Sequence, residues 1–523
     1  MSPRITFIGA GSIGFTRQLV SDILAVAQLQ KCTISLTDCN PDNLDMVTRL
    51  IRRDMEANHS EATLCATTDR REALRGADYV FCLVRVGGIE AFELDIDIAL
   101  RYGVDQCVGD TLCPGGIMYA QRTIPALLDF CKDIREVANP DCLLLNYANP
   151  MAMNTWACTT VGGVRTVGLC HGVQGGHGMI KWVIEREWNR DNGFEPGSEG
   201  YRSLALSDVD IVCAGINHQT WYIRVLFNGQ DWTGRLLEGF ERHPEYCHTE
   251  KVRIDMLRRF GYFSTESNGH LSEYLPWYRK RPDEIHKWID LSSWINGETG
   301  GYLRVTTEGR NWFETDFPNW LKEPPRIFSQ ENRGHEHGSY IVEALETGKI
   351  YRGHFNVINN GCIANLPDDA VVEVPGYVDR NGISIPRVGT LPLGCAAVCA
   401  SSISVQRLGV AAACSGDDTL LRQAMMLDPL TGAVCSPDEI WQMTDAFLVA
   451  QARWLPQYVE AIQKAQERIE QDNPVAPRTG YRGAARITTK SVEEMSRSRE
   501  EATRNASQAD KGMARTHASV GRG

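Results

Sequence analysis

The stretch Ile5-Thr-Phe-Ile-Gly9-Ala-Gly11-Ser-Ile-Gly14 near the start of the chain decides the fold. It opens with an apolar run that is typical of a buried strand, and residues 16–28 carry apolar side chains at helical spacing. Glycines in the pattern G-x-G-x-x-G between a strand and a helix permit a tight turn at Gly9 and close approach of a pyrophosphate at Gly11. The free N–H groups of the helix start face that anion. The stretch therefore predicts a dinucleotide-binding turn.

An acidic residue ends the second strand of this pattern. Residues 33–36 are typical of a strand, and Thr37-Asp38 follows them. A carboxylate at Asp38 accepts hydrogen bonds from both hydroxyls of a ribose and repels a 2′-phosphate, which favours NAD over NADP. The alternative is a glycine turn in an α/β domain that binds no dinucleotide.

The strand–helix alternation continues to about residue 150. Apolar strands without polar alternation, separated by helical patterns, predict a parallel sheet that is covered on both faces. We therefore expect a doubly wound, Rossmann-like α/β domain over residues 1–150. Further strands are expected near 62–65, 79–84 and 142–145.

The rest of the chain divides into a mixed part and a tail. Residues 151–470 predict an α+β domain that binds substrate and metal. Residues 471–523 lose aliphatic periodicity and are rich in Arg, Ser, Ala, Thr and Glu, which predicts a disordered tail. Helices are expected in the mixed part at 151–160, 175–188, 249–260, 338–347 and 437–470.

Composition limits the partners of the protein. The 523 residues are 43% hydrophobic and carry a net charge of −12, which disfavours binding to a nucleic acid. Seventeen cysteines without a regular framework indicate a reducing compartment. No apolar run approaches the roughly 18 residues of a membrane span. We expect a cytoplasmic protein with a small-molecule substrate and neither a nucleic-acid nor a membrane partner.

Two residues after strand-like segments are candidate metal ligands. Cys170 lies in Val167-Gly-Leu-Cys-His-Gly172, and His218 follows the strand-like segment 209–214. A thiolate and an imidazole at the ends of two strands can converge on one divalent ion, whose remaining positions substrate and water would fill. The alternative is a core thiol and a hydrogen-bonded core histidine.

Three further loops carry polar side chains. Asn149 follows the strand at 142–145 and can hold sugar hydroxyls, or it can form an Asx-turn before Pro150. Asp110 precedes a helix, where it contacts substrate or caps that helix. His270, Glu273 and Tyr274 lie close together in sequence and offer a base, or they form an aromatic helix start. A dinucleotide site with these residues leaves three classes open: a dehydrogenase, a glycosidase that uses NAD, and an NAD-sensing module.

Several longer strings together resemble glycoside hydrolase family four, of the α-galactosidase (melibiase) type. The resemblance covers about residues 4–460 and leaves out the tail. It rests on Ile5–Ser12, Asp110-Thr-Leu-Cys-Pro-Gly-Gly-Ile117, Arg122-Thr-Ile-Pro125, Asn146-Tyr-Ala-Asn-Pro-Met-Ala-Met-Asn-Thr-Trp156, Gly168-Leu-Cys-His171, Ala214-Gly-Ile-Asn-His218, Gly269-His-Leu-Ser-Glu-Tyr274, Asn365-Leu-Pro367 and Val388-Gly-Thr-Leu-Pro392.

The resemblance implies roles for individual residues. Cys170 and His218 would hold a manganese ion, and Asn149 and Asp110 the sugar. NAD would lie against Gly9, Gly11, Ser12 and Asp38.

One position bears on the kind of sugar. Family members that act on 6-phosphorylated sugars carry an Asp directly after the metal-binding cysteine, where this chain has His171. An unphosphorylated sugar is therefore expected. The base is a Tyr in the phospho-sugar members, and by register that Tyr falls nearer His270 than Tyr274.

The resemblance also implies a mechanism in which NAD is a bound catalyst. NAD⁺ oxidises C3 of the sugar, His270 or Tyr274 removes the C2 proton, and the glycosidic oxygen leaves with His171 as its acid. Water then adds and the hydride returns. The expected substrate is an unphosphorylated α-galactoside of the melibiose type. The alternatives are an α-glucosidase, or an α-galacturonidase or α-glucuronidase, of the same family, and a lactate- or malate-type dehydrogenase of another class. Similar proteins are homodimers or homotetramers.

Overall fold

The computed structural model describes residues 2–471 and 481–498. One sheet runs through the molecule, in the order β3-β2-β1-β4-β5-β6-β10-β11-β7-β8-β9, with β12 paired to β11. The strands are β1 Arg4–Ile8, β2 Thr33–Thr37, β3 Thr63–Ala66, β4 Tyr79–Cys82, β5 Leu143–Asn146, β6 Arg165–Gly168, β7 Val209–Ile216, β8 Gln219–Phe227, β9 Gln230–Asp231, β10 Tyr351–Ile358, β11 Val371–Asp379 and β12 Gly382–Ser384.

The first six strands in chain order form the parallel part of this sheet, and the doubly wound α/β fold is confirmed. Their side chains face helices on both sides, which is why β4 and β5 are buried at every residue. The helices of this half and of the linking region are α1 Ile13–Leu24, α2 Pro41–Ala57, α3 Arg70–Leu74, α4 Gly88–Arg101, α5 Cys113–Val137, α6 Met151–Thr160 and α7 Gly172–Asp191.

The remaining strands pair antiparallel, and β10 joins the parallel part through β6 at Asn356 and Gly168. The boundary expected at residue 150 therefore falls inside one sheet. The helices of this half are α8 Leu236–Arg242, α9 Pro244–Cys247, α10 Lys251–Phe260, α11 Asn268–Tyr274, α12 Pro282–Trp288, α13 Gly301–Trp320, α14 His337–Thr347, α15 Leu393–Ser415, α16 Asp418–Leu427, α17 Pro429–Val434, α18 Pro437–Ala450 and α19 Val459–Gln471.

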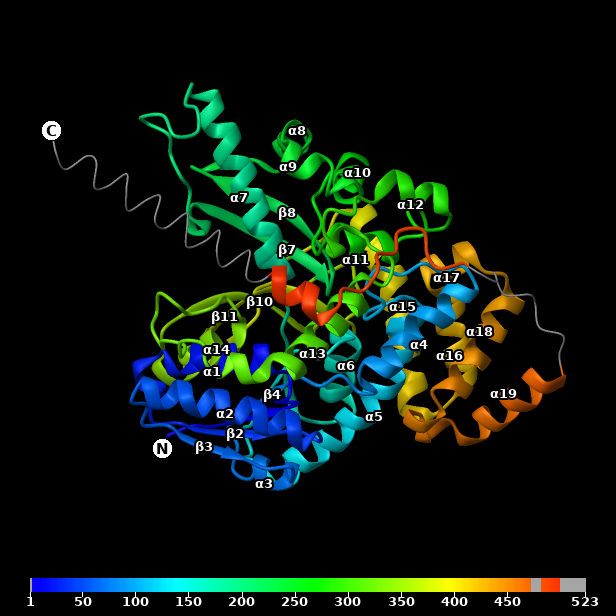
Figure 1. The fold of residues 1–523 in the computed structure, drawn as a ribbon. Coiled ribbons are helices and arrows are strands. Elements are labelled where there is room, and N and C mark those ends of the chain that lie inside the picture. Colours follow the sequence, from blue (N-terminus) through cyan, green and yellow to red (C-terminus); the bar gives the residue numbers. More distant parts are fainter. Residues whose placement is uncertain (1, 472–480, 499–523) are drawn as a thin grey trace.

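Figure 1 shows three regions around the centre of the chain. The N-terminal strands and α1–α3 lie at the lower left with α14, the helices α15–α19 lie at the right, and α7 with β7 and β8 projects at the top. The parallel sheet is covered in part by later segments, because Phe313 of α13 and Ile341 of α14 join the core that contains Ile5 and Phe7.

Four of the five expected helices in the mixed part match observed ones, namely α6, α7, α10 and α14. The fifth, at 437–470, is divided into α18 and α19, because the chain turns at Gln451 through two short 3₁₀ helices, the second of which starts at Pro456. Proline lacks the N–H that would continue a helix.

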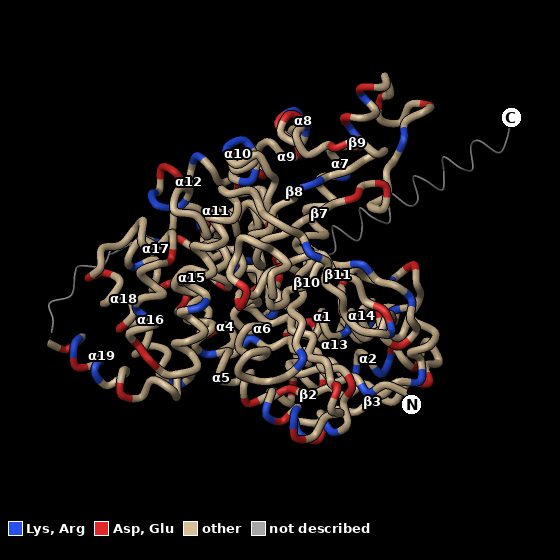
Figure 2. The backbone as a smooth tube through the Cα atoms, turned by 180° about the vertical axis from the view of Figure 1, so that it is seen from behind, with Lys and Arg blue, Asp and Glu red and all other residues tan. Residues whose placement is uncertain are grey.

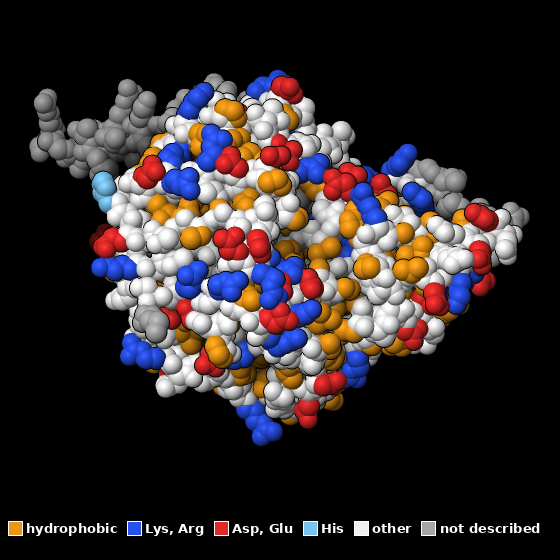
Figure 3. Space-filling model, turned by 90° about the horizontal axis from the view of Figure 1, so that it is seen from below, with side chains coloured by type: hydrophobic (Ala, Val, Ile, Leu, Met, Phe, Trp, Pro, Cys, Tyr) orange, Lys and Arg blue, Asp and Glu red, His pale blue; other side chains and the backbone are white. Residues whose placement is uncertain are grey.

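Within the described residues, α15 is long and apolar enough to cross a membrane by length and composition alone. In this structure, 56% of the apolar stretch of α15 is buried inside the protein, where the helix packs against α5, α6 and α16. No disulfide joins any of the 17 cysteines, all of which lie in the described residues, and most of them are buried. Lys and Arg alternate with Asp and Glu over the outside of the chain (Figure 2), and the face seen in Figure 3 also mixes the two signs.

The tail expected at 471–523 lies largely outside the described residues, which omit 472–480 and 499–523. The described part, 481–498, contacts both halves of the protein. Ala485 is buried, and the Tyr481 hydroxyl donates to the carboxylate of Asp105.

Candidate active site

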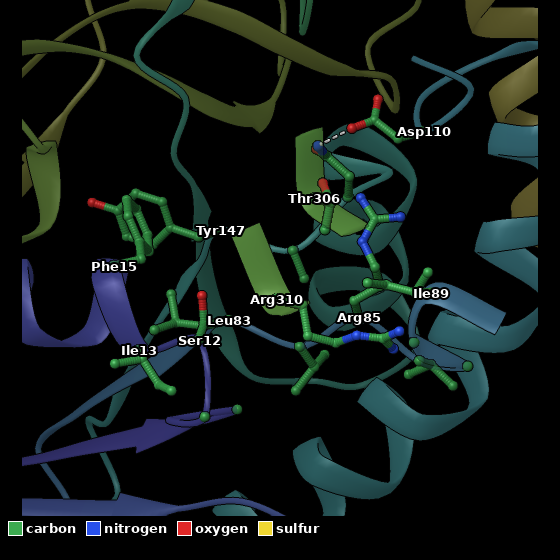
Figure 4. Close-up of a pocket in the computed structure, with 18 of the residues that line it drawn as sticks. Ser12, Ile13, Phe15, Leu83, Arg85, Ile89, Asp110, Tyr147, Thr306 and Arg310 are labelled. Atoms are coloured by element: carbon green, nitrogen blue, oxygen red, sulfur yellow. Dashed lines mark hydrogen bonds between the residues drawn. The ribbon is translucent and has the colours of Figure 1, made fainter. Parts of the chain in front are cut away.

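A cavity of about 1520 Å³ runs along the carboxyl ends of the parallel strands. It continues from the glycine turn after β1 to the loops after β5 and β6. Figure 4 shows Ser12 and Phe15 on one side of it, Asp110 on another, and Thr306 and Arg310 of α13 between them. Ten of the eleven candidate residues line this cavity: Gly9, Gly11, Ser12, Asp38, Asp110, Asn149, Cys170, His171, His218 and His270.

The dinucleotide end is shaped by two glycines. Gly9 has a φ of +82°, and a Cβ there would lie 2.9 Å from the backbone of Leu83 and Val84. A Cβ on Gly11 would lie 2.7 Å from Oδ2 of Asp38, which accepts the Gly11 N–H at 2.8 Å. Helix α1 then begins with Ser12 as its N-cap residue. The turn leaves the space and the backbone N–H groups that a pyrophosphate requires.

The other end of the cavity gathers potential metal ligands. Cys170 follows β6, and His218 lies in the tight turn between β7 and β8 with a φ of +63°. One ligand atom each from Cys170, His218 and Glu266 lie within 4.8 Å of one another. A second group of the same kind joins Asp110, His218 and His270. The two predicted ligands are therefore close together, with a carboxylate beside them.

A hydrogen-bond relay sets the tautomer of His218. The hydroxyl of Thr111 donates to Oδ1 of Asp110 at 2.8 Å and lies 2.8 Å from Nδ1 of His218. Because the hydroxyl has a single proton, it accepts from His218, and Nδ1 carries the imidazole proton. Nε2 then has a free lone pair. A hydrogen bond that fixes the tautomer in this way is typical of metal-binding histidines.

The thiol and the carboxylate of this group are buried against each other. Burial raises the pKa of Cys170 well above its usual range, and the charge of Glu266 adds to the rise. The Cys170 thiol donates to Oε2 of Glu266 at 3.7 Å. Burial would also raise the pKa of Glu266, but three histidines, His218, His270 and His171, lower it overall. A divalent cation fits here, because it would replace the thiol proton and compensate the buried carboxylate.

Asp110 and Asn149, the two candidate sugar-binding residues, contact each other. Nδ2 of Asn149 donates to Oδ2 of Asp110 at 2.8 Å, whereas Oδ1 of Asn149 is buried with no hydrogen-bond partner among the described residues. An unpaired buried acceptor is costly unless a ligand donates to it. A sugar hydroxyl is a suitable donor.

The two candidate bases differ in position. His270 lines the cavity, and its Nδ1 lies 2.7 Å from the hydroxyl of Ser267. Burial and the neighbouring His218 lower the pKa of His270 to about 4, so its neutral form prevails at neutral pH. Tyr274 lies behind His218, with its hydroxyl 3.5 Å from Nδ1, and burial raises its pKa well above the usual range. Tyr274 is outside the cavity lining.

The start of α14 holds the segment that contains Cys170. Nδ1 of His171 lies 3.4 Å from the carboxylate of Glu336, and this pairing raises the pKa of His171 to about 9 although 67% of its side chain is exposed. His337, the next residue, donates from Nε2 to the carbonyl of Cys170 at 3.1 Å. His171 is thus held in its protonated form beside the cavity.

Sequence reasoning missed four residues of this site: Thr111, Glu266, Glu336 and His337. The sequence could have indicated Glu266, because this acidic residue lies only a few positions before His270. No such indication existed for Glu336 and His337, since their partners lie far away in the sequence.

A dinucleotide turn in the same cavity as a thiol, an imidazole and a carboxylate defines an α/β protein built for nucleotide- and metal-assisted chemistry. Residues 4–185 match the family model described as "Family 4 glycosyl hydrolase", and residues 213–431 match the model of that family's C-terminal domain. The chain therefore belongs to family 4 of the glycosyl hydrolases.

Similar proteins agree with this assignment. An α-galactosidase of Rhizobium meliloti is 55% identical over 500 residues, covering 95% of this chain and 98% of that protein. An α-galactosidase of Bacillus subtilis is 33% identical and covers 87% of this chain and 99% of its own. An α-galacturonidase of the same organism is 27% identical over 82% of this chain and 93% of its own.

Solved structures share the fold. A putative glucosidase, LplD, of B. subtilis superposes with a TM-score of 0.73 at 24% identity, over 86% of this chain and all of that one. A 6-phospho-β-glucosidase of Thermotoga maritima, solved with manganese, NAD⁺ and glucose-6-phosphate, gives a TM-score of 0.66 at 20% identity, over 86% of this chain and 99% of that one.

Proposed function

We propose that this protein is an NAD- and Mn²⁺-dependent α-galactosidase that acts on unphosphorylated α-galactosides. The observation that carries the proposal is the group formed by Cys170, His218 and Glu266, which shares one cavity with the turn at Gly9 and Gly11. A hydrolase without a resident cofactor needs no such turn, and a simple dehydrogenase needs no thiol–imidazole pair. The two curated relatives of highest identity named above are both α-galactosidases.

We assign the two ends of the cavity to two ligands, a dinucleotide and a metal ion. Gly9, Gly11, Ser12 and Asp38 would hold the dinucleotide, and Cys170 and His218 the metal ion, with Glu266 as a third ligand. When bound, the dinucleotide would supply a hydride acceptor at C3 of the sugar, and the metal an electrophile for its oxygens.

The chain's own side chains supply the proton transfers. His270, neutral at working pH, takes the C2 proton at Nε2, because its Nδ1 faces Ser267. His171, protonated beside Glu336, gives its proton to the glycosidic oxygen of the leaving group. Asn149 and Asp110 orient the sugar hydroxyls. Tyr274 acts behind His218 as a positioning residue.

A second substrate class is favoured by one observation. Arg85 lines the cavity over the rings of Phe92 and Tyr119, and its Nη1 is buried without a hydrogen-bond partner among the described residues. A guanidinium with a free N–H binds a carboxylate well. The alternative substrate is therefore an α-galacturonide. A relative of lower identity is named an α-galacturonidase.

A panel of nitrophenyl glycosides tests these proposals. With NAD⁺, Mn²⁺ and a thiol reductant, hydrolysis of the α-galactoside should exceed that of the α-glucoside, the α-galacturonide and the 6-phosphorylated sugars. Chelator should abolish turnover, and turnover in D₂O should place deuterium at C2 of the released galactose. Product without deuterium at C2 contradicts the elimination route, and greater activity on the galacturonide favours the alternative.

The Cys170→Ser variant separates this enzyme from a dehydrogenase. The thiolate is a metal ligand in the proposal, so the variant should lose hydrolysis and Mn²⁺ affinity while its dissociation constant for NAD⁺ stays within about twofold, since the two ends of the cavity are distinct. We also propose that the protein is cytoplasmic and forms a homodimer or a homotetramer. Sedimentation of the purified protein tests the oligomeric state.

A further inference from the structure

The buried carboxylate of Asp105 connects the C-terminal segment to the cavity. Asp105 and Arg279 are fully buried and form an ion pair. Oδ1 of Asp105 also accepts from the hydroxyl of Thr299 at 2.7 Å. Oδ2 accepts from the hydroxyl of Tyr481 and from the N–H of Ala484, both at 2.9 Å. Two of the groups that satisfy this carboxylate therefore come from the far end of the chain.

Further contacts fix the same segment along its length. Ala485 and Thr299 exchange two hydrogen bonds, at 2.9 and 3.1 Å, and Ala485 packs against Ile285 and Ile289. The N–H of Lys490 donates to Oε1 of Glu308 in α13 at 2.6 Å. In Figure 1 this segment, drawn in red, crosses the face of the protein from the side of α12 and α17 towards α13. We call residues 481–490 the strap.

The groups that the strap holds lead directly into the cavity. Residues 106–110 follow Asp105 and end at Asp110, which contacts Asn149. The carbonyls of Gln106 and Cys107 accept from the N–H groups of Gly300 and Tyr302 at the start of α13. Helix α13 then lines the cavity with Tyr302, Thr306 and Arg310.

We infer that the strap, acting through the positioning residue Asp105, aligns the loop 106–110 and helix α13 for binding of sugar and dinucleotide. The strap lies outside the residues that the family descriptions match, which end at 431. The inference rests on the proposed function for its ligands alone.

Full-length variants test the strap. Ala485→Glu places a carboxylate at a site that is 4% exposed and displaces the strap, whereas Tyr481→Phe removes one hydrogen bond to Asp105. The matched control is Thr488→Ala, at an exposed position of the same segment. Loss of one buried hydrogen bond corresponds to a change of about tenfold in an equilibrium constant, which sets the size of the effect for Tyr481→Phe.

The expected result is a higher KM for nitrophenyl α-galactoside and a higher Kd for NAD⁺ in both variants, with kcat within about twofold of wild type. Amide hydrogen exchange at 106–110 and at the start of α13 should become faster, and Thr488→Ala should match wild type. A lower melting temperature with unchanged KM, Kd and exchange at 106–110 overturns the inference, because the strap would then stabilise without positioning.

Two further outcomes stay informative. If Ala485→Glu does not fold, Tyr481→Phe decides alone, because it retains the ring that packs beside Leu303. If the wild-type protein has no galactosidase activity, the proposed function fails. The Kd for NAD⁺ and the exchange at 106–110 then still support or overturn the role of the strap.

Discussion

Gly172 leaves the space that Glu266 occupies beside Cys170. A Cβ at Gly172 would collide with the carboxylate of Glu266, although the φ of Gly172 is ordinary for any residue. The requirement for glycine here is therefore one of space. Glycine at this position lets a carboxylate approach the backbone of the segment that contains Cys170.

We expect Gly172→Ala to displace Glu266 and to lower the affinity for Mn²⁺ by about tenfold or more, which is the usual effect of disturbing groups around a metal. Calorimetric titration with Mn²⁺ measures this directly. The control is Gly175→Ala in the same helix, because a Cβ there would meet no other described atom within 4 Å. Equal affinities in the two variants would refute a role of Glu266 at the metal.

At this scale, the sequence predicted the residues that follow strands. Cys170 and Asn149 lie just past the parallel strands β6 and β5, whose carboxyl ends share one edge of the sheet, and His218 lies just past the antiparallel strand β7. Glu266 and Thr111 reach the same place through tertiary packing, which no local pattern encodes. Their proximity to Cys170 and His218 is visible only in the structure.

Helix α11 holds the loop 106–110 through one side chain. The carboxylate of Glu273 accepts the N–H groups of Cys107, Val108 and Gly109 at 2.6 to 3.0 Å. Burial raises the pKa of Glu273 to about 7, although these bonds oppose the rise. The folded protein therefore keeps a proton on this group at a pH where the unfolded chain has lost it.

The free energy of unfolding should consequently fall as pH rises from about 4.5 to about 7, with a limiting slope of about 1.4 kcal/mol per pH unit from this group. Glu273→Gln should lose that slope. It should also be less stable at every pH, because its amide turns an N–H towards Gly109. Urea unfolding over this pH range measures both, with exposed Glu93→Gln as the control. Identical slopes in wild type and Glu273→Gln would count against this assignment.

Elements with a clear hydrophobic pattern were predicted from the sequence, and others were not. Strand β4 is a continuous apolar run, and β5 is apolar up to its last residue, Asn146, so their burial follows from composition. Helix α15 escaped prediction because Ala, Cys, Ser and Val surround it on all sides, leaving no polar face to reveal the helical period. Packing against α5 and α6 stabilises this segment as a helix.

At the scale of the whole molecule, one sheet joins the two expected domains. The β6–β10 and β11–β7 pairings carry the sheet from its parallel half into its antiparallel half, and one hydrophobic core draws on both. Long-range strand order of this kind is absent from local sequence patterns. The contacts of the strap with Asp105 were equally invisible, because composition alone favoured disorder there.

We therefore expect a single main transition in scanning calorimetry, because neither half can unfold while the shared sheet remains intact. Saturating NAD⁺ should move this transition as a whole to higher temperature. Two resolved transitions, of which NAD⁺ shifts only one, would indicate that the halves are independent.

The uninterrupted cavity has a consequence for inhibitor design. The turn at Gly9 and the cluster at Cys170 open into one space, so a galactose tethered to a nucleoside diphosphate could occupy both ends in a single molecule. Tethering makes the second contact intramolecular, and its gain depends on linker length rather than on any new contact. The protein thereby offers a template for bisubstrate compounds selective against enzymes that hold only one of the two halves.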